Sequence, residues 1–531
     1  MNFRARALEL QIREALTRSP AVFLSGPRQA GKSTLARHLV SSGLLAGYVT
    51  LDDITAFGAA SADPEAFLRS FSGPVVVDEV QLAPGLFRIL KTLIDERRAA
   101  GGQDANGRFL LTGSANVMAL PGLSDALVGR MSVSTLYPFS ATEILGRGKP
   151  VINGLFDQDI TSSISHLSDG LDEAINRATF PGISGLPAAD VNAWFSGYLT
   201  TLLQRDVRQL AEIEKIAAFP TILTVLAARA AGLLNDADSA RDAKLNAMTY
   251  RRYRALLQQL FLITLVPPWS RNIAKRVVKS PKLYFADTAL LCHQLGVSVA
   301  GLRPRNPALY GRVVENFVAT ELLKQIATIP DGALHHFRAH DGSEVDFVVE
   351  RRSGAVIGIE VKTAESVTAD DFKGLKVLKD AAGKDFVRGI VLYLGRNATA
   401  FGSDMFAMPL NTLWRMNMDV TTDKDVRYAP TLSAYIFWAN YGDRTRLRCL
   451  ISREVIDDHF HNNASEKAAL SAINKNWGAI WPLFQRKIVD GRIESIAHDN
   501  GPKFIAGRHQ TIRQVTLTPQ DLGYKDFRKS A

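Results

Sequence analysis

The stretch GPRQAGKST, residues 26–34, decides the fold class of the first part of this 531-residue chain. It follows a short apolar run, AVFLS at 21–25, and precedes a helical pattern, LARHLVSS at 35–42. The pattern G-x-x-x-x-G-K-[ST] between a strand and a helix is typical of the P-loop, which binds nucleotide phosphates in α/β domains. The sequence therefore predicts an α/β domain that binds ATP.

Each residue type in this loop has a physical reason to be there. Gly26 and Gly31 let backbone N–H groups point at phosphate oxygens, and Lys32 adds a positive charge for the β- and γ-phosphates. The hydroxyl of Ser33 is a ligand for Mg²⁺, and Thr34 follows it in the first turn of the helix. We therefore expect these five residues to bind ATP, with Ser33 also at the metal.

An apolar run that ends in acid, PVVVDEVQ at 74–81, supplies the second half of such a site. Asp78 is expected to hold Mg²⁺ through water, and Glu79 to polarise the water that attacks the γ-phosphate. The next strand, RFLLTGSAN at 108–116, ends in three candidates for a γ-phosphate sensor: Thr112, Ser114 and Asn116. Arg130 is a candidate for a charge-neutralising catalytic arginine, although a surface arginine at a turn fits its context equally well.

Several segments resemble a family of prokaryotic AAA-type ATPases, related to archaeal-type ATPases, whose members carry a C-terminal domain of uncharacterised role. They are GPRQAGKSTL, VVVDEVQLAPGLFRILKTLID, FLLTGSAN, LVGRMSVSTLYPFSATEIL, KSPKLYFADTAL, VVENFVATEL, EVDFVVE and GIEVK. This resemblance covers about residues 1–415. It implies an ATP-binding core, a winged-helix-like middle and a restriction-endonuclease-like end. It also makes a ring or dimer an expected arrangement, because AAA-type sites often take an arginine from a neighbouring subunit.

The middle of the chain carries an unbalanced basic run. Residues 147–215 read as a helical linker or lid, in which Arg205 is placed to reach a nucleotide or to pair with an acid. Residues 216–300 read as three helices and a two-stranded wing. From Met248 to Lys282 there are eight lysines and arginines and no acid. Such a run is expected of phosphate contact, and it predicts DNA binding by Arg251, Arg254, Lys275 and Arg276. The alternative is a winged helix whose basic side packs against another domain.

A second set of charged residues lies in GSEVDFVVERRSGAVIGIEVK, residues 342–362. Glu360 and Lys362 point to one face of a strand, and a hairpin brings Asp346 beside Glu360. Two adjacent carboxylates repel each other unless a cation lies between them, and Mg²⁺ suits such oxygen ligands. Lys362 would then stabilise a transition state with developing negative charge.

This spacing resembles that of the PD-(D/E)xK phosphodiesterases, and Glu315 takes the place where that fold often brings a further acid. The resemblance implies a catalytic set of Asp346, Glu360 and Lys362, with Glu315, Asp346 and Glu360 at the metal. Alternatively, the hairpin acids pair with Arg351 or Arg352 and are structural. The histidines of HHFRAH at 335–340 are expected at the surface.

Net charge, cysteine content and hydropathy limit which partners and which cellular location are expected. The net charge of +10 favours a polyanionic partner, while two cysteines suit a reducing cytosol and the absence of an apolar run of eighteen residues predicts no membrane span. After about residue 420 a small α+β domain is expected, weakly similar to short bacterial domains of unknown function, with Trp477 and Trp481 in its core. The predicted domains are 1–146, 147–215, 216–300, 301–418 and 419–531.

We expect a cytoplasmic ATPase that acts on DNA through a winged helix and a Mg²⁺-dependent nuclease-like domain. The alternative is an ATP-dependent regulatory or scaffolding switch, whose nuclease-like domain binds nucleic acid or protein without cutting.

Overall fold

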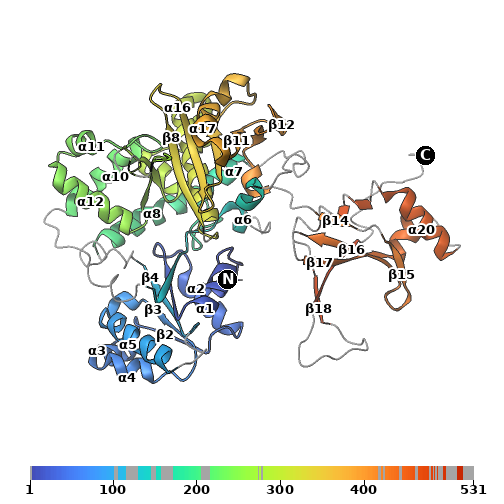
Figure 1. Cartoon of the computed structure of the whole chain (residues 1–531), viewed down its shortest axis with the longest axis horizontal. Helices are drawn as coiled ribbons and strands as arrows, with labels where there is room; N and C mark the ends of the chain where they lie inside the picture. The colour runs from blue at the N-terminus through green and yellow to red at the C-terminus, as the bar shows by residue number, and fades with distance from the viewer. Residues whose placement is uncertain are drawn as a thin grey trace. The chain divides into compact units, whose positions relative to one another are not determined.

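The chain forms two compact units in a computed structural model (Figure 1); the first holds almost all residues up to Trp414 and the second those from Arg415. The structure describes residues 3–100, 106–114, 129–144, 151–156, 171–204, 216–272, 274, 276, 279–329 and 331–414 of the first unit. In the second it describes 415, 420–422, 425–441, 445–460, 465–477, 480–481, 483–484, 487, 494–497 and 511–517.

A five-stranded parallel sheet forms the centre of the first domain, in the order β2-β3-β4-β1-β5. Its strands are β1 (Ala21–Ser25), β2 (Gly47–Thr50), β3 (Val75–Asp78), β4 (Phe109–Gly113) and β5 (Met131–Thr135). The predicted strand at 21–25 is therefore confirmed with its bounds. Because all five strands are parallel, the loops that follow them lie at one edge of the sheet.

Helices cover both faces of this sheet because its strands are apolar on both sides. Val22 and Leu24 pack with residues of α1 (Glu9–Arg18) and α2 (Lys32–Ser41). Ala21 and Phe23 pack on the other face, where the covering helices are α3 (Ile54–Ala62), α4 (Pro64–Arg69) and α5 (Gly85–Ala99). The loop after β1 thus starts from a strand that is buried along its whole length.

The middle region contains the elements expected from its sequence pattern. Helix α8 (Ala188–Leu202) is followed by α10 (Phe219–Ala228), α11 (Asp236–Asp242) and α12 (Ala247–Gln259). Strands β6 (Ile263–Val266) and β7 (Lys282–Phe285) then form an antiparallel pair, and α14 (Thr288–Leu295) follows. One face of α12 packs into the core, since Tyr250, Tyr253 and Leu257 are buried. Helices α10, α11 and α12 and the two-stranded sheet match the predicted three helices and wing, and the winged-helix class stays a prediction.

The last part of the first unit is a six-stranded sheet in the order β12-β13-β11-β10-β9-β8. Its elements are α16 (Pro307–Ile326), β8 (Gly332–Arg338), β9 (Glu344–Arg351), β10 (Val356–Val361), α17 (Lys373–Ala382), β11 (Phe386–Tyr393), β12 (Thr399–Ala400) and β13 (Met405–Pro409). Strands β8, β9 and β10 are antiparallel neighbours, whereas β10, β11 and β13 run parallel. The predicted hairpin of β9 and β10 is confirmed.

The second unit is a small α+β domain, as predicted. Its sheet has the order β14-β16-β17-β19-β18, with β15 beside β16, and its helices are α19 (Arg453–Phe460) and α20 (Glu466–Lys475). The strands are β14 (Val420–Thr422), β15 (Arg427–Ala429), β16 (Ala434–Tyr441), β17 (Thr445–Ser452), β18 (Glu494–Ala497) and β19 (Thr511–Leu517). Trp477 and Trp481 pack against its hydrophobic core, which confirms the core prediction for both.

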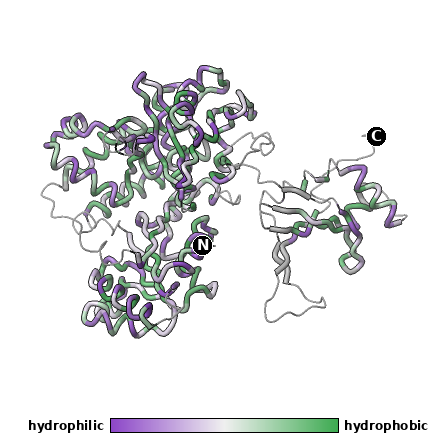
Figure 2. Tube along the Cα trace, in the orientation of Figure 1, coloured by the Kyte–Doolittle hydropathy of each residue, from purple (hydrophilic) through white to green (hydrophobic). Residues whose placement is uncertain are grey.

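Figure 2 shows hydrophobic and hydrophilic residues alternating along the described helices. Among the residues that the structure describes, no helix is long and apolar enough to cross a membrane.

Candidate functional site

The loop after β1 has a conformation that only glycine tolerates at its first position. Gly26 has a φ of +149°, and a Cβ built there would lie 2.2 Å from the carbonyl oxygen of Leu136. Gly31 has a φ of +96° and precedes α2 as its N-cap, without a side-chain cap. No side chain at the N-cap accepts a hydrogen bond from the first N–H groups of α2, so these groups are available to donate to a bound anion.

Lys32 is turned into the loop. Its ammonium donates to the carbonyl oxygens of Gly26 and Pro27, both at 2.9 Å, and the residue is only 5% exposed. Ser33 and Thr34 follow in the first turn of α2. The loop thus brings the predicted glycines, the ammonium and the hydroxyl of Ser33 to one helix N-terminus.

Two acids stand at the end of β3, at the same edge of the sheet. The Asp78 carboxylate is buried, with Tyr48 donating to one oxygen at 2.5 Å and Thr112 to the other. Burial and the hydrogen bond to Asp78 raise the pKa of Tyr48 to about 12, so its phenol stays a donor. These two donors fix the orientation of the Asp78 carboxylate.

Glu79 lies in a left-handed conformation, with a φ of 57°. Its amide donates to the hydroxyl of Thr112 at 3.2 Å, and its carboxylate accepts from the Gln81 amide. Gln81 also donates to Ser114, at 3.2 Å. Thr112 and Ser114 therefore join the acids from the neighbouring strand, as two of the three predicted sensors. The third, Asn116, lies outside the described residues.

This donor set fits ATP with Mg²⁺. Backbone N–H groups at the start of α2 and the Lys32 ammonium suit phosphate oxygens, while the Ser33 hydroxyl and the Asp78 carboxylate are hard oxygen ligands. The residues that would hold the metal are thus Ser33 and Asp78.

Arg130 does not lie at this edge of the sheet. It precedes β5, whose first residue pairs with Ala21 at the start of β1. Its guanidinium pairs with Asp95, at 2.6 and 2.9 Å. A catalytic role of Arg130 at the phosphate loop of its own subunit is therefore wrong for this structure, because parallel strands put their starts and ends at opposite edges.

Arg6, which is not among the predicted site residues, binds the phosphate loop through its guanidinium group. The guanidinium of Arg6 donates to the carbonyl oxygen of Ala30 in the loop at 2.8 Å and to that of Tyr137 at 2.6 Å. It also pairs with Glu143 at 3.0 Å. Its partners are more than 20 residues away, so no local pattern points to it.

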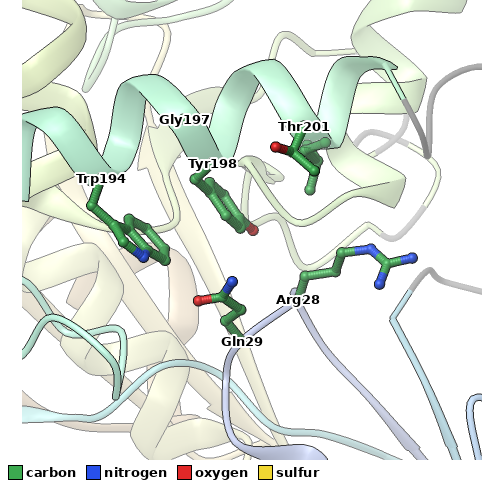
Figure 3. Close-up of a pocket in the computed structure, with 7 residues that line it drawn as sticks. Arg28, Gln29, Trp194, Gly197, Tyr198 and Thr201 are labelled. Atoms are coloured by element: carbon green, nitrogen blue, oxygen red, sulfur yellow. The ribbon is translucent and has the colours of Figure 1, made fainter. Parts of the chain in front are cut away.

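A pocket of about 310 Å³ lies between the tip of the phosphate loop and α8 (Figure 3). Trp194, Tyr198 and Thr201 extend from α8 toward Arg28 and Gln29 of the loop. The indole and phenol rings stack at 4.7 Å. A helix of the region predicted as a linker or lid thus faces the phosphate loop across this pocket, while Arg205 lies outside the described residues.

The second predicted set is brought together by α16, β9 and β10. The backbone N–H of Val361 donates to Asp346 at 3.0 Å, and that of Asp346 to Glu360 at 3.3 Å. The Lys362 ammonium lies 3.0 Å from Glu360. Glu315, on α16, lies close enough to share a cation with Asp346.

That shared cation is Lys282, the first residue of β7, which the sequence analysis did not single out at this site. Its ammonium lies 2.9 Å from Glu315 and 2.8 Å from Asp346, and its side chain is 7% exposed. Tyr284, two residues further along the strand, donates to the same oxygen of Glu315 at 2.7 Å. Strand alternation explains why both side chains reach one acid.

This arrangement does not fit a divalent metal at Glu315, Asp346 and Glu360, because an ammonium already lies between two of them. Within the described ranges, no group of three or more His, Cys, Asp or Glu side chains could hold a metal ion. Arg351, one of the two arginines considered as structural partners of these acids, instead donates to Asn153 and lies over the ring of Phe156.

The electrostatics of this cluster follow from burial. Burial and the repulsion of Asp346 raise the pKa of Glu315 and of Glu360 to about 7 each, although Lys282 and Lys362 oppose the shift. Burial alone would lower the pKa of Lys282, but the carboxylates of Asp346 and Glu315 outweigh it and raise that pKa. Lys282 therefore stays charged at neutral pH.

These shifts predict a pH dependence of stability. Between about pH 4.5 and 7 the folded chain binds protons on Glu315 and Glu360 that the unfolded chain does not, so this cluster stabilises the fold as the pH falls through 7. The gain is at most about 3 kcal/mol per carboxyl, at about 1.4 kcal/mol for each pKa unit. Thermal unfolding of the wild type and of Glu360→Gln should differ most above pH 7 and converge toward pH 5. A constant difference across this range would contradict the assignment.

The basic run of the middle region is largely paired with acids. Arg251 and Arg254 both contact Asp236, at 3.3 and 3.1 Å. Arg276 pairs with Glu350 of β9 at 2.6 Å, and Lys275 lies outside the described residues. Three of the four predicted DNA-binding cations thus have acidic partners within the chain, which the basic run in the sequence did not indicate. The alternative, a basic side packed against another domain, fits Arg276 and Lys282.

His335 and His336 are buried in β8, so the expected surface position is wrong for both. Burial lowers the pKa of His336 to about 4, which keeps its ring neutral.

Comparison with known proteins supports a nucleotide-binding domain of the AAA type around the phosphate loop. Residues 18–145 match the family model described as AAA domain. Residues 168–300 and 310–413 match two models described as domains of unknown function, DUF8612 and DUF4143. The chain thus carries an AAA domain followed by two domains of unknown function, which agrees with the AAA-type resemblance seen in the sequence.

Two curated relatives give the family. "Uncharacterized protein Rv2008c" of Mycobacterium tuberculosis (strain ATCC 25618 / H37Rv) and "Uncharacterized protein Mb2031c" of Mycobacterium bovis (strain ATCC BAA-935 / AF2122/97) are each 34% identical over 356 residues. The match covers 66% of this chain and 72% of each relative. The chain belongs to the family of these two proteins.

Among solved structures, the Walker-type ATPase PABY2304 of Pyrococcus abyssi is 14% identical, with 55% of this chain and 99% of that chain covered and a TM-score of 0.32. The McrB AAA+ hexamers of Thermococcus gammatolerans, with bound McrC, are 11% identical, with coverages of 52% and 73% and a TM-score of 0.17. The class rests on the AAA-domain match and not on these two likenesses.

Proposed function

We propose that this chain binds and hydrolyses ATP at the edge formed by the P-loop, β3 and β4. The observation that carries the proposal is the pair of acids at the end of β3, fixed by donors from the neighbouring strands beside the glycine-bounded loop. Such a constellation supplies both the binding of phosphate and the activation of water that hydrolysis needs.

Each group has a defined task in this proposal. Lys32 leaves the carbonyls of its own loop and bonds to phosphate oxygens, and the N–H groups at the start of α2 hold the same anion. Bound Mg²⁺ would neutralise phosphate charge, with Ser33 and Asp78 as its holders. Glu79 accepts a hydrogen bond from the attacking water, and Gln81 keeps its carboxylate in place.

Phosphate release by the full chain with ATP and Mg²⁺ tests this proposal. Lys32→Ala removes one charge that stabilises the transition state, so turnover should fall about a hundredfold or more. Lys91→Ala, at an exposed lysine of α5, is the matched control and should leave turnover unchanged. Equal turnover in the wild type and Lys32→Ala would remove the assignment.

We further propose that the ATPase acts as a nucleotide-dependent switch on its C-terminal domain. Support comes from contacts within the first unit. Buried Glu321 of α16 accepts from the N–H of Ala141, after β5, at 2.9 Å. Gln325 of the same helix accepts from Val151 and Ile152. Helix α16 also carries Glu315, so movement of the ATPase domain would reach the acid cluster through one rigid element. An assembly of several subunits, in which a neighbour supplies an arginine, is part of this proposal.

A second candidate function is cleavage of a nucleic-acid phosphodiester by Asp346, Glu360 and Lys362. One observation favours it, namely that Glu360 accepts hydrogen bonds both from the Lys362 ammonium and from the backbone N–H of Asp346. DNA is the expected substrate class because the chain carries a net charge of +10. Lys282 opposes cleavage, since it takes the position that a metal would need.

Plasmid degradation with Mg²⁺ and ATP separates the two candidates. If the wild type degrades DNA and Asp346→Ala does not, the cleavage candidate stands. If both fail while ATP is hydrolysed, the switch without cleavage remains, and DNA binding is then measured by its dependence on salt.

A further inference from the structure

We propose that the ammonium of Lys282 is the built-in cation of the carboxylate cluster, so that the wild-type chain takes no divalent metal there. The inference shares one premise with the proposed cleavage function, namely that these carboxylates form a cation site. It does not depend on whether the site cuts or on whether the chain hydrolyses ATP.

Hydrogen bonds already use most of the oxygens that a metal would need. The Lys282 ammonium donates to Glu315 Oε1 and Asp346 Oδ1. Asp346 Oδ2 accepts from the N–H of Val361, and the two oxygens of Glu360 accept from Lys362 and from the N–H of Asp346. Five of the six carboxylate oxygens thus have donors of the chain itself. A metal would have to displace several of these donors to gain its ligands.

Charge gives a second reason. The cluster holds three carboxylates, and two ammonium groups compensate them, those of Lys282 and Lys362. A divalent ion placed beside Asp346 would lie next to the Lys282 ammonium in a site of low exposure, where like charges repel strongly. The metal and the ammonium therefore exclude each other.

The strand that carries Lys282 is anchored beside the cluster. Asn316 follows Glu315 on α16 and is fully buried. Its side chain accepts from the N–H of Phe285 at 2.8 Å and donates to the carbonyl oxygen of the same residue at 3.3 Å. On the other side of Lys282, the backbone N–H of Leu234 donates to the carbonyl oxygen of Pro281 at 2.8 Å. Lys282 is thus held by the backbone on each side and is not a surface side chain that happens to fold over.

Binding of Mn²⁺ to the full chain without nucleotide, followed by electron paramagnetic resonance, tests the proposal. The wild type and Asp346→Asn should bind Mn²⁺ equally weakly. Lys282→Gln should bind Mn²⁺ about tenfold or more tightly than the wild type, a difference of about 1.4 kcal/mol or more. The gain should vanish in Lys282→Gln/Asp346→Asn. Lys279→Gln is the matched control, because Lys279 lies on the same segment and donates to the Arg338 carbonyl instead.

Two results would overturn the proposal. The first is that the wild type binds Mn²⁺ and that Asp346→Asn abolishes this binding. This experiment does not depend on whether a lysine variant folds. The second is a folded Lys282→Gln chain that binds Mn²⁺ no better than the wild type. If Lys282→Gln does not fold, Lys282→Gln/Glu315→Gln removes one charge of each sign, and the same two readings apply to it.

Failure of the cleavage candidate gives a different result. A Lys282→Gln chain that binds Mn²⁺ at Asp346 but leaves plasmid DNA intact supports the inference and removes cleavage. Wild-type cleavage that requires Mg²⁺ and Asp346 removes the inference and keeps cleavage.

Discussion

Glu79→Gln is expected to keep ATP binding and to lower hydrolysis by about 10²- to 10⁴-fold, which is the range for losing a general base. The substitution keeps the size of the side chain and its contact with Gln81, but the amide no longer accepts the proton of an attacking water. The phosphate loop, with Lys32 and the start of α2, is untouched. Binding of a fluorescent ATP analogue and phosphate release are measured on the same preparation.

The control for this prediction is Glu65→Gln, at an exposed acid of α4 that pairs with Arg69. It should leave both binding and turnover unchanged. If Glu79→Gln hydrolyses ATP at the wild-type rate, Glu79 is not the base. Loss of both binding and turnover would mean that Glu79 instead supports the left-handed turn after β3.

Asp287→Ala is expected to destabilise the first unit by about 3 kcal/mol or more, because it removes a cap and leaves buried donors unsatisfied. Asp287 is fully buried at the N-cap of α14, where it accepts from the N–H of Leu290 at 2.9 Å. Its other oxygen accepts from the N–H and the hydroxyl of Thr179. Thr179 in turn accepts from the N–H of Phe139, after β5. This single side chain therefore joins the strand of Lys282 to the ATPase domain.

Thermal unfolding by calorimetry measures this effect, and Asp242→Ala is its control. Asp242 pairs with Arg229 at the surface and is 50% exposed, so its loss should cost less than about 1 kcal/mol. Equal shifts of the melting temperature for both variants would contradict the role given to Asp287. Asp287→Asn should fall between the two, since an amide oxygen still accepts one of the bonds.

Local patterns predicted the ATPase edge because its residues follow buried strands directly. The loop that contains the glycines and Lys32 starts directly after one apolar strand, and Asp78 ends another, so parallel strands bring these positions to one edge. The same rule puts Arg130 at the opposite edge, since it lies just before a strand. The hairpin of β9 and β10 was predictable for the same reason as the P-loop, from side-chain alternation and a short turn.

Long-range partners could not be read from the sequence. Lys282 meets Asp346 across 64 positions and Arg6 meets Tyr137 across 131. A lysine within a basic run is expected at a charged surface unless its acidic partners are known. The missing signal was burial, since Lys282 begins KLYF, a strand that is buried at all four positions. A lysine in such a strand needs a counter-charge, and that requirement could have pointed to the acids of the next domain.

The most direct test is anomalous diffraction from crystals of the wild-type chain grown with Mn²⁺ and a non-hydrolysable ATP analogue. We predict an anomalous peak beside Ser33 and Asp78, next to the bound phosphates, and none at coordination distance from Asp346 and Glu360. A peak between Asp346 and Glu360, with the Lys282 ammonium turned away from both acids, would contradict the account.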